Sequence, residues 1–235
     1  QSYADAADIF QRVLSTTPDD FISHVGMSII REDEGNLDEA IYHMQRAFEK
    51  QPSNVAIQDE LRRLYGMRDG IEPPKIRMTR GALARMYMKG ELYQQAGLEL
   101  RSALADDPDR VALQLLLAKV DVKIGNSSEA IDLTQAIIRK LPNAYEANLI
   151  LANLLSENEQ EDEALAKQKI VQSLNPYVAF VSDEFPEPEQ VPDQAVSLEK
   201  LDWNPVDENL RSVDQPAWAE SLGLELDDNQ TLEQE

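Results

Sequence analysis

The sequence contains no cysteine and only two histidines among its 235 residues. Without cysteine the chain can form no disulfide bond or thiolate zinc site, and it has no cysteine nucleophile. It also lacks a glycine-rich phosphate loop, a serine nucleophile elbow and an HExxH motif. His24 and His43 fall within helical patterns, where we expect packing roles. We therefore expect no enzyme, no cofactor and no bound metal.

Long apolar runs are missing as well. No stretch approaches the roughly 20 residues that a membrane-spanning helix needs. Basic residues are scarce: 22 Lys and Arg stand against 44 Asp and Glu, a net charge of −22. A field of this sign repels nucleic acids and anionic membranes. We expect neither as a partner, and we expect a cytoplasmic location.

The acidic residues are concentrated near the C-terminus. Residues 177–235 hold 16 Asp and Glu, opposed only by Lys200 and Arg211. High net charge with few β-branched residues is typical of disorder, so we expect an acidic, largely irregular tail. Both tryptophans of the chain, Trp203 and Trp218, lie in it. They either anchor a partner or pack back onto the rest of the chain.

A repeat occupies the remaining sequence. Five times an alanine is followed twelve residues later by a proline, at Ala6/Pro18, Ala40/Pro52, Ala96/Pro108, Ala130/Pro142 and Ala164/Pro176. Three of the four steps between successive alanines are 34 residues long. A fixed period of this size indicates stacked supersecondary units that form a solenoid.

Each unit contains two helical patterns separated by a turn. In residues 111–144, Leu113, Leu117 and Val120 recur at helical spacing beside the small Ala118. Gly125 ends the first helix, and Pro142 ends the second because the residue before a proline is pushed out of the α region. The alanine after each turn lies where two helices approach too closely for a larger side chain.

This pattern resembles the tetratricopeptide repeat family, most clearly in residues 35–54, 91–110 and 125–144. The resemblance implies an all-α, right-handed α-solenoid of helix-turn-helix repeats. It also implies a non-enzymatic scaffold or adaptor that binds a protein or peptide on its concave face. The implied repeats are residues 21–54, 77–110, 111–144 and 145–178, preceded by a half repeat over residues 3–18.

The period fails once. The step from Ala40 to Ala96 is 56 residues, 22 more than one period. The excess contains a helical pattern over residues 55–67 with a broad polar face, which we interpret as a capping helix. A proline- and glycine-containing segment follows it. We therefore predict two blocks, residues 1–68 and 77–176, joined by a hinge at residues 69–76.

Basic side chains on the first helices give a candidate site. Arg85 and Lys89 are spaced i, i+4, and Lys119 and Lys123 repeat the pair one period later. Asn153 occupies the next equivalent position. The resemblance places these residues in the concave groove, where they would bind an acidic segment or the chain's own tail. Alternatively, they are ordinary solvated lysines and arginines.

Two other functions remain open. The chain could be a structural subunit of a larger assembly, held through its N-terminal edge and its tail. It could also be the regulatory part of an enzyme whose catalytic region precedes Gln1.

Overall fold

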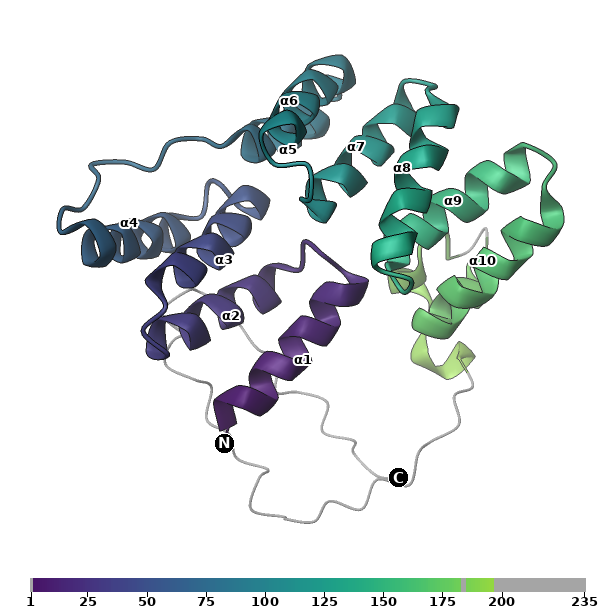
Figure 1. Cartoon of the computed structure of the whole chain (residues 1–235). Coiled ribbons are helices and arrows are strands. Elements are labelled where there is room, and N and C mark those ends of the chain that lie inside the picture. Colours follow the sequence, from purple (N-terminus) through teal and green to yellow (C-terminus); the bar gives the residue numbers. More distant parts are fainter. Residues whose placement is uncertain (1, 183–184, 197–235) are drawn as a thin grey trace, which may run out of the picture.

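A computed structural model describes residues 2–182 and 185–196, which form ten α-helices and no strand (Figure 1). The helices are α1 (Ser2–Thr16), α2 (Phe21–Asp33), α3 (Leu37–Lys50), α4 (Val55–Asp69), α5 (Arg80–Lys89), α6 (Tyr93–Asp106), α7 (Val111–Lys123), α8 (Ser127–Lys140), α9 (Tyr145–Glu157) and α10 (Glu161–Leu174). Short 3₁₀ turns follow at η1 (Pro176–Phe180), η2 (Pro188–Gln190) and η3 (Asp193–Ala195). The fold is an all-α solenoid of helical hairpins, as the sequence predicts. None of the described helices is long and apolar enough to span a bilayer.

Small residues lie where the two helices of each hairpin cross. On the second helices, Ala40, Ala96, Ala130 and Ala164 are buried. On the first helices, their counterparts Ser28, Ala84, Ala118 and Ala152 are buried too. The Ser28 hydroxyl donates a hydrogen bond of 2.7 Å to the carbonyl oxygen of Ala40. This contact brings a side chain of α2 against the backbone of α3, which leaves no room for larger side chains.

The turn inside each hairpin has the same backbone conformation. One residue in it takes a left-handed φ, at Gly35 (76°), Glu91 (58°), Gly125 (83°) and Glu159 (62°). A left-handed φ suits glycine and strains residues that carry a Cβ. The repeat therefore imposes this geometry on two glutamates as well as on two glycines.

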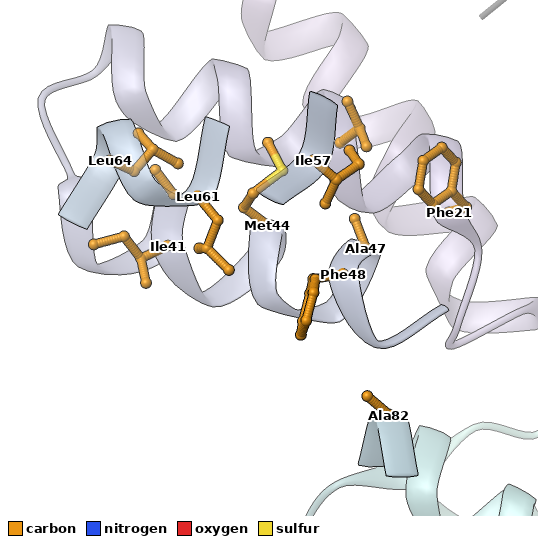
Figure 2. Packing of buried hydrophobic residues seen from close by; sticks show 11 residues of the cluster. Phe21, Ile41, Met44, Ala47, Phe48, Ile57, Leu61, Leu64 and Ala82 are labelled. Carbon is orange, nitrogen blue, oxygen red and sulfur yellow. The ribbon is translucent and has the colours of Figure 1, made fainter. Parts of the chain in front are cut away.

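The 22-residue excess forms α4 and a helix-free segment over residues 70–79. Ile57, Leu61 and Leu64 of α4 are buried against α3 in one apolar cluster. Ala82 of α5 belongs to the same cluster (Figure 2). Helix α5 thus packs against α3 directly, because its N-terminal turn completes that cluster. The division into two blocks around residues 69–76 stays a prediction.

The first residues of the predicted tail fold back on the last hairpin. The Tyr177 hydroxyl donates a hydrogen bond of 2.9 Å to the Asp193 carboxylate, and Val191 and Val196 are buried. Residues 197–235, with Trp203 and Trp218, lie outside the described part of the chain. The prediction of an irregular acidic tail therefore applies mainly to residues that the structure does not describe.

Candidate functional site

The first helices α5, α7 and α9 enclose a groove with a volume of about 280 Å³. Its polar lining includes three residues of the predicted site: Lys119 and Lys123 from α7, and Asn153 from α9. Its apolar floor consists of Met88, Val122, Ile150 and Leu154, and Glu157 lies at one end. We call this site the α7–α9 groove. The structure thus brings together residues that are 30 or more positions apart in sequence.

The apolar floor of the groove was not predicted from the sequence. Val122 lies one turn from Lys119 on the same helix, and Ile150 lies one turn before Asn153. Residues three apart on a helix share a face, so this spacing was the available signal. This spacing is hard to recognise in the sequence, because most apolar residues of α7 and α9 are buried in the core and mask the few that face the groove.

The two lysines of the groove differ in their partners. The Lys119 ammonium lies 2.6 Å from a carboxylate oxygen of Glu146, at the start of α9. Lys123 is exposed and makes no ion pair with any residue that the structure describes. Lys123 is therefore the groove cation that is available to a ligand without breaking an internal contact.

Arg85 and Lys89 line a neighbouring cavity of about 690 Å³, between α5 and the turn after α3. The Arg85 guanidinium lies 3.2 Å from the Asp19 carboxylate, and the Lys50 ammonium lies 2.8 Å from the same oxygen. Arg85 is therefore tied to the turn between α1 and α2, and its side chain is only 17% exposed. Lys89 is exposed and has no ion-pair partner within the described ranges.

The Asp19 carboxylate is stabilised in its ionised form by neighbouring cations. Burial alone would raise the pKa of Asp19, but the hydrogen bond from Lys50 and the charges of Arg85 and Lys119 hold it below its ordinary value. The carboxylate thus lies among three cations, one of which lines the α7–α9 groove.

The same turn also reaches the far end of the solenoid. Thr16 and Thr17 share a cavity of about 340 Å³ with Tyr145, Leu174 and Asn175. Residues near the start of the chain therefore lie close to the last hairpin, and the helices follow a curved path that returns towards α1 (Figure 1).

The two histidines form a buried pair between α2 and α3. Their Nδ1 atoms are 3.0 Å apart, and His24 Nε2 lies 3.2 Å from the carbonyl oxygen of Pro18. A neutral imidazole has one N–H. We assign that proton to Nε2 in His24, which donates to Pro18, so that its Nδ1 accepts from Nδ1–H of His43. The described residues contain no group of three potential metal ligands.

A sequence model of the tetratricopeptide repeat family matches residues 87–145, from the end of α5 to the start of α9. A search of curated proteins gives no significant match. Among solved structures, the crystal structure of MamA is 16% identical with a TM-score of 0.34, covering 76% of this chain and 91% of that chain.

YrrB, described as a TPR protein with an unusual peptide-binding site, is 20% identical with a TM-score of 0.39. That match covers 81% of this chain and 96% of that chain. TM-scores this low carry no argument about this chain. The assignment of helical repeats is supported instead by the family match and by the buried small residues at each helix crossing. Residues 87–145 thus match the tetratricopeptide repeat family, and they lie within an all-α solenoid of helical hairpins.

Proposed function

We propose that this chain is a non-enzymatic scaffold that binds an acidic segment of a protein or peptide in the α7–α9 groove. Tetratricopeptide repeats are generally protein-interaction modules. The observation that carries the acidic preference is Asp19, whose carboxylate lies 2.8 Å from the Lys50 ammonium and 3.2 Å from the Arg85 guanidinium. A concave face that stabilises one carboxylate of its own has the charge to bind others.

The groove offers polar contacts and apolar contacts to a ligand. Lys123 supplies an ammonium for a charge-assisted hydrogen bond to a ligand carboxylate. The Asn153 side chain is exposed and can both donate to and accept from a peptide backbone. Ile150 and Val122 offer apolar surface to a large side chain of the ligand. The preferred ligand is therefore an acidic segment that also carries an aromatic or aliphatic residue.

The test is the dissociation constant of a fluorescein-labelled acidic peptide, compared between wild type, Lys123→Glu and Lys169→Glu. Lys169 is exposed on α10 and has no ion-pair partner among the described residues, so it matches the charge change outside the groove. Losing a charge-assisted contact costs about 1.5 kcal/mol, which is about tenfold in the dissociation constant. We expect that loss for Lys123→Glu alone.

If both variants bind the peptide equally weakly, the effect comes from net charge alone, and the groove is refuted as the binding site. Arg85 and Lys119 are poorer targets for this test, because reversal of either would also break an internal ion pair.

A second candidate function, a subunit of a larger assembly, is favoured by one observation. Ile9 and Val13 lie one turn apart on α1, and 58% and 36% of their surfaces are exposed. Burial of these side chains by another protein would remove apolar surface from water. Sedimentation of a stable monomer at high concentration would exclude self-assembly through this face. The cytoplasmic location stays a prediction from sequence.

A further inference from the structure

The α7–α9 groove has a candidate occupant within the chain. Building on the function proposed above, we infer that the groove binds the chain's own C-terminal segment, with the indole of Trp218 on the apolar floor. A ligand of the proposed function then has to displace this segment.

The position at which the described chain ends supports this inference. Residues 185–196 pack beside η1 and the end of α10, where Tyr177 bonds Asp193. Glu189 lies close enough to Tyr145 for its charge to contribute to the raised pKa of that tyrosine, after the larger effect of burial. Tyr145 begins α9, and its neighbour Glu146 is the partner of Lys119. The described C-terminal residues therefore pass near the start of α9, the helix whose second half lines the groove.

The length of the segment is sufficient. Helix α9 has 13 residues and is about 20 Å long. Trp218 follows Val196 by 22 residues, which span up to about 70 Å when extended. A tether of this length allows Trp218 to reach any point of the groove. It also keeps the segment at an effective concentration that a free ligand must exceed.

Charge selects Trp218 over Trp203. Residues 212–228 contain Asp214, Glu220, Glu225, Asp227 and Asp228 and no basic residue. Trp203 also has acidic neighbours, Asp202, Asp207 and Glu208, but Lys200 and Arg211 flank them and reduce the local negative charge.

The groove offers complementary chemistry. Lys123, which lines the groove, has no ion-pair partner in the described part of the chain. The floor presents Val122, with 38% of its surface exposed, beside Ile150. An indole flanked by carboxylates is complementary to an apolar floor beside one unpaired lysine.

Intrinsic fluorescence tests the inference in the full chain, because Trp203 and Trp218 are its only tryptophans. The Trp203→Phe variant reports on Trp218 alone. We expect its emission to be blue-shifted and protected from acrylamide, relative to a free peptide of residues 212–228. We expect Lys123→Glu in this background to shift the emission towards that of the free peptide. Lys169→Glu, the control outside the groove, should leave it unchanged.

Three results would overturn the inference. Emission and quenching equal to those of the free peptide would mean that Trp218 is not bound. Protection that Lys123→Glu leaves intact would place Trp218 elsewhere. Protection that rises with protein concentration would mean that the segment binds a second copy of the chain.

A further measurement separates this inference from the proposed function. Trp218→Ala in the full chain should tighten binding of the fluorescein-labelled acidic peptide several-fold, because a competing occupant is weakened. If the affinity for the peptide is unchanged and still depends on Lys123, the contact between the groove and the C-terminal segment is refuted, but the proposed function is not. Absence of any binding to Trp218→Ala would sink both.

Discussion

The buried histidine pair predicts that the protein loses stability as the pH falls from 7 to 5. Burial, helped by the charge of Arg46, lowers the pKa of His24 from 6.5 to about 4. Burial likewise lowers the pKa of His43 to about 4, helped by His24, Arg31 and Arg46. The hydrogen bond to Pro18 and the carboxylates of Asp19 and Asp20 act in the opposite direction on His24, but they do not outweigh burial.

The sign follows from the two protonation states. Between pH 6.5 and pH 4 the unfolded chain binds protons on these histidines and the folded chain does not. The free energy of unfolding is therefore at its full value above pH 6.5, falls as the pH drops through this window, and levels off below about pH 4. Between pH 7 and pH 5 the loss is about 2 kcal/mol for each histidine.

Urea unfolding followed by circular dichroism at pH 7, 6 and 5 measures this loss. The reference is the double variant His24→Gln/His43→Gln, whose amides can bond to each other and do not titrate. Both proteins share the same carboxylates, so the difference between their pH profiles isolates the histidines. Parallel profiles would refute the assignment of two neutral buried imidazoles. If the double variant does not fold, His43→Gln alone should show about half of the wild-type loss.

Two further predictions concern stability. Glu49→Gln should lower the free energy of unfolding by about 3 kcal/mol, because the Glu49 carboxylate is 3% exposed and lies 2.5 Å from the Arg110 guanidinium, which is only 12% exposed and loses its counter-charge. A urea midpoint within error of wild type would contradict this. Glu159→Gly should raise the melting temperature, because it relieves about 1 kcal/mol of strain from the left-handed φ of Glu159. Gly125→Ala, at the equivalent position of another hairpin, should lower the melting temperature. Shifts of the same sign in both variants would exclude backbone strain as the cause.

Much of the fold follows from the sequence because the repeat is local. The alanine at each helix crossing and the proline after each second helix are 12 residues apart, so one period contains the information for one hairpin. The same periodicity placed Lys119, Lys123 and Asn153 on one face, because equivalent positions on adjacent first helices become neighbours. These parts could be predicted without knowing the curvature of the solenoid.

Contacts across the break could not be predicted in this way. Asp19 and Arg85 are 66 residues apart, and Glu49 and Arg110 are 61 apart, so neither spacing is a multiple of the period. Both pairs depend on how α5 packs against α3 after the 22-residue excess, and hence on the shape of the apolar cluster around Phe48 and Ala82. The sequence pattern predicted that Arg85 lies in an open groove, because nothing in it indicates that Asp19 contacts Arg85.

The unpaired lysines of the concave face have a structural explanation that competes with binding. Lys89 and Lys123 are the last residues of α5 and α7, where a cation stabilises the helix C-terminus by about 0.3–1 kcal/mol. Other helices of this chain also end in basic residues, such as Lys50 and Lys140. The position of Lys123 at a helix end is therefore not itself an argument for a ligand.

The surroundings of Lys123 provide that argument. A cation that serves only its helix needs no apolar neighbours, yet Val122 and Ile150 line the same cavity as Lys123. Exposed apolar side chains beside an unpaired charge gain free energy when a ligand covers them and supplies the counter-charge. Stabilisation of the helix and recognition of a ligand are thus separable, because only recognition requires the floor of the groove.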